Sequence, residues 1–185
     1  MLTAKIQSTV EKYPELQPVW QNVVADFDQC VKPPFVALLG AIIGQKISYV
    51  QAKALRSRLY KEFGTEFDSL TLLENTTRLQ EIFQDYPDKL TIIHNILKQE
   101  LDFNSSKIWK TLASLKGIGP WTISTIKITS CLEEDEFPSG DLFIRRRLQR
   151  LFNLPKLPTI KETVNISKRW QGSRTYVAWL LWRWF

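Results

Sequence analysis

The sequence predicts an all-α protein, and two observations predict it. Apolar residues recur at steps of three and four along most of the 185 residues, and no segment alternates polar and apolar residues as a half-buried strand does. Prolines and glycines interrupt these periodic stretches at short intervals. A composition of 44% hydrophobic and 24% charged residues is that of a globular domain and excludes disordered and fibrous classes.

The individual helices follow from the same periodicity. Residues 2–13 and 17–30 are expected as short helices, and one long helix follows Pro33-Pro34 and stops at Gly64. Further helices are expected at 69–74, 76–84, 88–101, from 104 or 105 to about 115, 121–132, 141–152, 159–170 and 173–185.

The charge of the chain is unevenly distributed. Lysine and arginine number 25 against 19 acidic residues, which gives a net charge of +6. Residues 141–185 hold ten basic and two acidic residues, whereas residues 133–136 are all acidic. A basic C-terminal quarter on a balanced chain favours a surface directed toward a polyanion.

Several classes of protein are excluded. No apolar stretch approaches the ~20 residues that cross a bilayer, and the N-terminus has no apolar signal segment, so we expect an intracellular protein with no membrane partner, in a bacterial cytoplasm or a nucleus. Two cysteines and one histidine are too few for a disulfide framework, a zinc site or a Ser-His-Asp triad. We therefore expect no tightly held metal.

The first chemical signal is Lys116-Gly-Ile-Gly-Pro120, which joins two expected helices. Glycines permit a tight turn and a close approach of backbone to a ligand. The free amides that open the second helix, at Gly119 and Trp121, form an anion site that phosphate commonly occupies. The alternative is a helix connection without a ligand.

The second signal is Asp141, which ends the loop 137–141 and opens a helix. Aspartate is a good N-cap, and that structural role alone explains its position. The same geometry also holds a carboxylate ionised and able to face a cationic centre. Cleavage of an N-glycosidic bond passes through such a centre, because the sugar becomes oxocarbenium-like.

Four segments, in this order, resemble the helix-hairpin-helix DNA glycosylase superfamily, in its 3-methyladenine DNA glycosylase II branch. They are the Gly-Gln helix at 39–48, the hairpin at 115–122, the aspartate loop at 137–141 and the closing helix at 170–182. The resemblance covers about residues 33–185.

The resemblance implies a two-lobed helical fold without an N-terminal β domain. Residues 1–185 would form one glycosylase domain, with one lobe at about 33–130 and the other made of 1–32 plus 131–185. A monomer with a DNA-facing cleft between the lobes is expected.

The same resemblance assigns roles at the hairpin and the aspartate. Gly117, Gly119 and Thr122 would grip a DNA phosphate through backbone amides and a hydroxyl. The hairpin carbonyls often hold a weakly bound monovalent cation in this family, and no other cofactor is implied. Asp141 would stabilise the oxocarbenium ion and orient the attacking water.

The aromatic residues divide into pocket and core. Trp182 would stack on the flipped base, and Tyr176 of the same motif is assigned to the base pocket. Trp121 would also contribute, packing either under the pocket or against the hairpin. For Trp179 and Trp184 we expect ordinary core packing.

Gln45, Lys46 and Arg174 complete the expected DNA contacts. Lys46 stands where relatives often place an apolar or amide wedge, so it either fills the gap left by the extruded base or is a solvent-facing lysine. Arg174 would contact DNA or pair with an acid. Other basic residues expected to contribute to a phosphate-facing surface, or to form a solvated helix face, are Arg145, Arg146, Arg147, Arg150, Lys168 and Arg169.

Departures from relatives refine the expected reaction. Trp121 stands where bifunctional relatives place a Schiff-base lysine, so a monofunctional glycosylase without lyase activity is expected. Two cysteines exclude an iron–sulfur cluster. Alkylated purines are the expected substrates, because their positive charge makes them good leaving groups. Thr125 and Leu142 stand where tyrosines can occur, so the pocket is leaner. A glycosylase for hypoxanthine, uracil or mismatches, and a non-catalytic DNA-binding module, are the alternatives.

Overall fold

The computed structural model describes residues 1–23 and 27–184, and within these ranges it is helical with no strand, which confirms the all-α prediction. The α-helices are α1 (Leu2–Lys12), α2 (Gln17–Trp20), α3 (Pro34–Gly44), α4 (Tyr49–Phe63), α5 (Ser69–Glu74), α6 (Thr76–Ile82), α7 (Pro87–Leu97), α8 (Ile108–Ser114), α9 (Pro120–Thr129), α10 (Leu142–Leu151), α11 (Ile160–Ser167) and α12 (Arg174–Arg183). Short 3-10 segments are η1 (Pro14–Leu16), η2 (Asp28–Cys30) and η3 (Lys168–Trp170). Residues 24–26, in the middle of the helix predicted over 17–30, and residue 185, the last of the helix predicted over 173–185, lie outside the described residues.

The chain divides into two compact units. Unit 1 consists of Met1–Val31 and Lys127–Phe185, and unit 2 consists of Lys32–Ile126. Helix α9 begins in unit 2 and its last residues belong to unit 1. Each unit has its own hydrophobic core.

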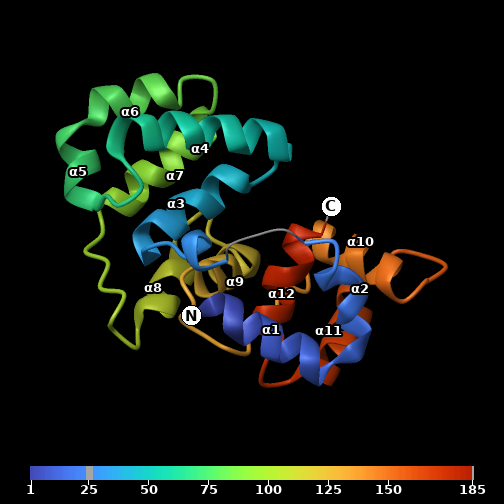
Figure 1. Cartoon of the computed structure of the whole chain (residues 1–185). Helices are drawn as coiled ribbons and strands as arrows, with labels where there is room; N and C mark the ends of the chain where they lie inside the picture. The colour runs from blue at the N-terminus through green and yellow to red at the C-terminus, as the bar shows by residue number, and fades with distance from the viewer. Residues whose placement is uncertain (24–26, 185) are drawn as a thin grey trace. The chain divides into compact units, whose positions relative to one another are not determined.

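Unit 2 is built around α3. Eight of the eleven residues of this helix are buried, because it is apolar on all sides, and such a helix is stable only when other elements surround it. Helices α4 and α7 pack directly against it (Figure 1). The core residues of these neighbours include Leu55 and Leu59 on α4 and Ile93 and Ile96 on α7.

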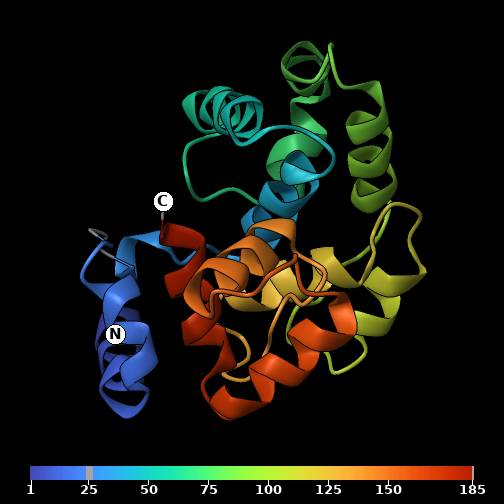
Figure 2. The same cartoon turned by 90° about the vertical axis from the view of Figure 1, so that its right-hand side faces the viewer.

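Unit 1 is built around α12, in which seven of ten residues are buried. Helix α1 packs along it through Leu2, Ile6 and Val10, and α10 packs against it from another side. Figure 2 shows α10, α11 and α12, coloured orange to red, close together, and α10 contacts both of the other two helices. The N-terminal segment is therefore part of this core.

The single long helix expected between Pro33-Pro34 and Gly64 is wrong. The structure divides it into α3 and α4 at residues 45–48. Ser48 caps α4 in a capping box, in which its side chain accepts a hydrogen bond from the Gln51 amide and the Gln51 side chain accepts one from the Ser48 amide. The predicted stop is confirmed, since α4 ends at Phe63 and Gly64 has φ +79°.

The helix expected over 17–30 is also wrong, because α2 ends at Trp20. A turn follows, in which the side-chain amide of Asn22 donates to the carbonyl oxygen of Pro18 at 2.7 Å. Asparagine competes in this way with the backbone for hydrogen bonds and favours turns. The later helices begin and end within a few residues of the predicted bounds.

Candidate functional site

The hairpin of unit 2 has the tight turn that its glycines predict. Helix α8 ends at Ser114, the amide of Ile118 donates to the carbonyl of Leu115 at 3.1 Å, and α9 begins at Pro120. Gly117 has φ +93°, a conformation that favours glycine, and a Cβ there would lie 2.6 Å from Cδ1 of Ile92. At Gly119 a Cβ would meet nothing within 4 Å, so only Gly117 is required by the turn itself.

Gln45 connects the end of α3 to this hairpin. Its side-chain amide donates to the carbonyl oxygen of Gly117 at 2.9 Å and to the hydroxyl of Thr122 at 3.0 Å. Thr122 is 2% exposed, so its hydroxyl faces Gln45 inside the unit. The structure therefore gives both residues an internal role, and their predicted contacts with DNA stay predictions.

Lys46 follows Gln45 in an exposed turn and has φ +55°. This left-handed conformation is uncommon for a residue with a side chain and commonly marks a constrained site. Exposure agrees with both readings of Lys46, as a wedge and as a solvent-facing lysine.

Trp121 packs within unit 2. Its ring atom Cη2 lies 3.5 Å from the position that a Cβ on Gly44 would take, so the indole contacts the end of α3 closely. This contact is with α3, so the two predicted placements of Trp121, under the pocket and against the hairpin, both stay predictions.

Asp141 is the N-cap of α10 in unit 1. Its Oδ1 accepts a hydrogen bond from the amide of Ile144 at 2.9 Å, and the residue is 6% exposed. The capping role weighed from the sequence is thus observed. The cap also fixes the carboxylate at the positive end of the helix dipole, which is the arrangement that the catalytic role needs.

Two of the three tryptophans in and directly after α12 lie in the core, as predicted. Trp179 and Trp184 are buried in the core of unit 1, which confirms their structural assignment. Trp182 is half-buried and meets Trp179 edge to face, with ring centroids 6.2 Å apart. A half-buried indole held by a buried one suits a stacking surface.

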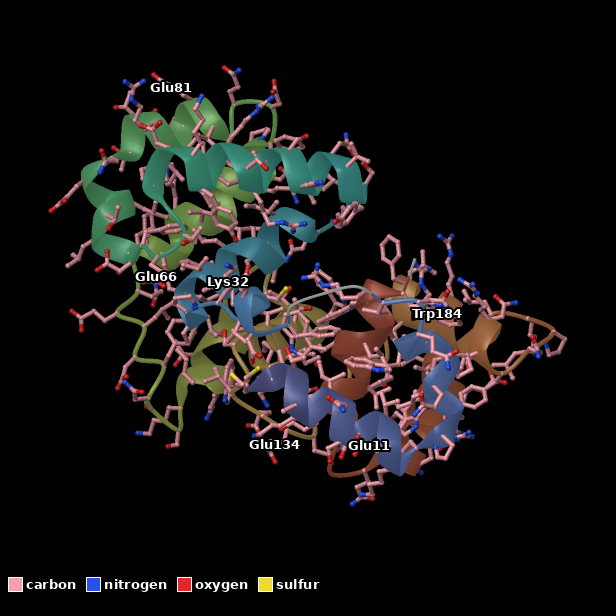
Figure 3. The ribbon with its side chains drawn as sticks, viewed as in Figure 1. Glu11, Lys32, Glu66, Glu81, Glu134 and Trp184 are labelled. Atoms are coloured by element: carbon pink, nitrogen blue, oxygen red, sulfur yellow. The ribbon has the colours of Figure 1, made fainter. Side chains whose placement is uncertain are left out.

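Tyr176 lies in a polar cluster of unit 1. Its hydroxyl donates to Oε1 of Glu134 at 2.7 Å, and Lys5 on α1 contacts the same carboxylate oxygen at 2.5 Å (Glu134 is labelled in Figure 3). Lys5 and the Tyr176 hydroxyl lower the pKa of Glu134, while burial and Glu134 raise the pKa of Tyr176. The tyrosine ring is buried, and its predicted place in a base pocket stays a prediction.

Arg174 is held by an acid that the sequence did not single out. Its Nε and Nη2 donate to the two oxygens of Asp135 at 2.7 and 2.8 Å, and the amide of Gly172 donates to Asp135 as well. This hydrogen bonding lowers the pKa of Asp135. The geometry favours the structural alternative for Arg174, and its contact with DNA stays a prediction.

Four of the other basic residues of the C-terminal quarter contact a backbone carbonyl or an aromatic ring of unit 1. Arg145 donates to the carbonyl of Pro158, Arg147 donates to the carbonyl of Trp184, Arg150 covers the Trp184 ring and Arg169 covers the Phe152 ring. Arg146 and Lys168 are exposed. The predicted phosphate-facing surface therefore also stabilises unit 1.

The hairpin carbonyls fit the monovalent cation that the resemblance implies. The carbonyl of Gly117 accepts from Gln45 and that of Leu115 accepts from Ile118, and each oxygen keeps a second lone pair. Elsewhere in residues 1–23 and 27–184 no group of three His, Cys, Asp or Glu residues is placed to hold a metal ion. No helix in these ranges is long and apolar enough to cross a membrane.

The search for relatives connects this arrangement to one kind of protein. No family model matches the chain. Two proteins of Bacillus subtilis are each 24% identical to this chain. The first, named "Putative DNA-3-methyladenine glycosylase YfjP", aligns over 165 residues, which are 79% of this chain and 57% of the relative. The second, a DNA-3-methyladenine glycosylase, aligns over 176 residues, which are 80% of this chain and 56% of the relative. DNA-3-methyladenine glycosylase 1 of Schizosaccharomyces pombe is 34% identical over 87 residues, which are 46% of this chain and 38% of the relative. The chain thus spans about half the length, or less, of the curated relatives it matches.

A solved structure supplies the fold. The 3-methyladenine DNA glycosylase of Schizosaccharomyces pombe in complex with abasic DNA superposes with a TM-score of 0.75 at 23% identity, covering 92% of this chain and 89% of the other. The fold is therefore that of the helix-hairpin-helix DNA glycosylases. Among them, the chain is similar in sequence and structure to the 3-methyladenine DNA glycosylases, which confirms the predicted resemblance at the level of these glycosylases.

Proposed function

We propose that this protein is a monofunctional DNA glycosylase of the 3-methyladenine DNA glycosylase II branch that removes alkylated purines from double-stranded DNA. The observation that carries the proposal is Asp141, a buried carboxylate fixed at the N-terminus of α10 in the same unit as the half-buried Trp182. The relatives named for 3-methyladenine support the substrate class.

The proposed reaction is a hydrolysis at C1′ of the deoxyribose. The damaged base leaves with the electron pair of the glycosidic bond, and the sugar becomes an oxocarbenium ion that the Asp141 carboxylate stabilises. Water then adds its oxygen to C1′ and loses a proton to solvent, so the products are a free base and an abasic site. An N3- or N7-alkylated purine is already cationic, so it departs without a strong general acid.

Binding in this proposal precedes the chemistry. The hairpin amides at Gly117 and Gly119 hold a phosphate, and Lys46 fills the gap left by the extruded base. The hairpin carbonyls would hold a monovalent cation, which would supply positive charge near the phosphate. In this proposal the half-buried Trp182 stacks on the flipped base, because its electron-rich ring attracts a cationic base. The protein acts as an intracellular monomer.

The test is the identity of the released base. The purified protein is incubated with methylated duplex DNA, and free bases are separated by chromatography. The proposal expects 3-methyladenine, with 7-methylguanine as a further product, and intact abasic strands. Release of uracil, hypoxanthine or mismatched bases instead would show another glycosylase. Tight DNA binding without release of any base would show a non-catalytic module.

A further inference from the structure

Lys89 is a buried lysine outside the residues used so far. It lies in the first turn of α7 and is 6% exposed. Its Nζ donates to the carbonyl oxygen of Ile42 at 2.9 Å and to that of Gln45 at 2.5 Å. These carbonyls lie at the C-terminal end of α3, where the helix dipole favours a cation. The Ile42 carbonyl also accepts a hydrogen bond from the Gln45 amide at 3.1 Å.

The peptide that Lys89 holds is the one that enters the Lys46 turn. The Gln45 carbonyl belongs to the Gln45–Lys46 peptide, and Lys46 itself has φ +55°. The left-handed conformation is unfavourable for a residue with a side chain, so contacts outside the turn must hold it in place. The ammonium of Lys89 is such a contact.

Helix α7 also touches the hairpin. Ile92, one turn after Lys89, packs with Cδ1 and Cγ1 2.6 and 2.7 Å from the position of a Cβ on Gly117. The Gln45 side chain reaches the same hairpin through Gly117 and Thr122. One helix therefore braces both the Lys46 turn and the hairpin, and Gln45 links the two.

We infer that Lys89 is a positioning residue that sets the Lys46 turn, and through it the proposed wedge, without contacting DNA. The inference deepens the proposed function and rests on it where the turn is said to meet DNA. Burial lowers the pKa of Lys89, and the charge of Lys46 lowers it further. Burial disfavours the charged form of a lysine, and an apolar side chain would fill the same space without this cost. The presence of a lysine here therefore supports a role for the ammonium itself.

The first arm of the test observes the turn in the free protein. Lys89→Met keeps the apolar stem and removes the ammonium, and Lys98→Met removes an exposed lysine at the end of the same helix as a matched control. The Cα chemical shift of Lys46 reports its backbone conformation. We expect it to move in Lys89→Met and to stay in Lys98→Met. An unchanged Lys46 shift in folded Lys89→Met would overturn the inference.

The second arm measures affinity for duplexes with and without an abasic-site analogue. Lys89→Met should weaken binding to the abasic duplex about tenfold, the loss expected for removing charge-assisted hydrogen bonds, and should affect the intact duplex much less. Lys46→Ala should show the same selective loss, and the double variant should be no weaker than either single variant. Fully additive losses would overturn the inference, because they would mean that the two lysines act independently.

The outcomes separate this inference from the proposed function. If the wild type releases no base, the proposed function fails, and the Lys46 shift and the double-variant cycle still decide the role of Lys89. If Lys89→Met does not fold, Lys89→Gln carries the same measurements, since its amide is a shorter donor in place of the ammonium. In Lys89→Gln the Cα chemical shift of Lys46 should lie between its wild-type value and the value expected without a donor. A shift identical to that of the wild type would contradict the need for a charge at position 89.

Discussion

Replacing Gly117 by alanine should destabilise the protein far more than the same change at Gly119, although both glycines belong to one turn. At Gly117 the added methyl group faces two penalties. The backbone has φ +93°, which costs a residue with a Cβ about 1–2 kcal/mol. The Cβ would also lie 2.6 and 2.7 Å from Cδ1 and Cγ1 of Ile92, and relieving such overpacking costs about 1–3 kcal/mol.

These two penalties predict a loss of roughly 2–5 kcal/mol in the free energy of unfolding for Gly117→Ala. Gly119 does not have a positive φ, and an added Cβ there would have no atom within 4 Å. Gly119→Ala should therefore change the free energy of unfolding by less than about 1 kcal/mol. Urea unfolding followed by tryptophan fluorescence measures both values.

The Ile92 contact can be separated from the backbone strain by a double-mutant cycle. Ile92→Ala removes both clashing carbons, so Gly117→Ala should cost less in that background, and the remaining cost is the strain of the positive φ. Equal losses for the two glycines, or a Gly117→Ala cost that Ile92→Ala leaves unchanged, would refute this account of the hairpin.

Four further substitutions test unit 1. Asp135→Asn should lower stability at pH 7 by about 1–2 kcal/mol, since it removes the carboxylate charge and one of the two oxygens that accept from Arg174. Arg174 lowers the pKa of Asp135 from its ordinary value of 3.8, so this stabilisation is present above about pH 4 and is lost as the pH falls further. In urea unfolding at a series of pH values, the stability of Asp135→Asn should therefore fall less steeply below about pH 4 than that of the wild type. An equally steep fall would contradict the pairing. Trp182→Ala should slow base release at least about tenfold with modest loss of stability, whereas Trp179→Ala, at a site 3% exposed, should cost about 3–5 kcal/mol; the reverse pattern would exchange their roles. Tyr176→Phe should cost about 1 kcal/mol in urea unfolding through its hydrogen bond to Glu134, and no loss would show that this bond contributes nothing.

The parts of the fold that the sequence predicted well are those with local signals. Asp141 follows a Pro-Ser-Gly segment and caps α10, Thr159 caps α11 in a capping box, and Gly64 ends α4. Each of these ends is determined by hydrogen bonds within a few residues, so residue type and spacing suffice to predict it.

The division between α3 and α4 was missed because the apolar period continues across it. Ile47 keeps the spacing, and Lys46 adopts a positive φ without being glycine or asparagine. The capping-box pattern of Ser48 and Gln51 was the local signal that marks the start of α4. The left-handed turn itself depends on Lys89, 43 positions later in the chain, and no local pattern reports such a contact.

Partners distant in sequence account for the other omissions. Asp135 and Glu134 were recognised only as part of an acidic stretch, yet the first holds Arg174 and the second holds Lys5 and Tyr176. The burial of Lys89 could have been predicted from the sequence, since it shares a helical face with the buried Ile93 and Ile96. A lysine on an apolar face must find acceptors inside the fold, but the sequence does not say which.

In the proposed reaction the charge of Asp141 drives base release. Asparagine caps helices about as well as aspartate, so Asp141→Asn removes the charge and keeps the hydrogen bond to the Ile144 amide. Asp68 is an equivalent cap on α5, where it accepts from the Thr71 amide, and Asp68→Asn is the matched control.

The measurement is the single-turnover rate of 3-methyladenine release at saturating protein, beside the affinity of each variant for duplex DNA. The account predicts that Asp141→Asn releases base on the order of 100-fold more slowly than the wild type while binding DNA equally well, and that Asp68→Asn matches the wild type. Base release by Asp141→Asn at the wild-type rate would contradict the account, because Asp141 would then be a helix cap and nothing more.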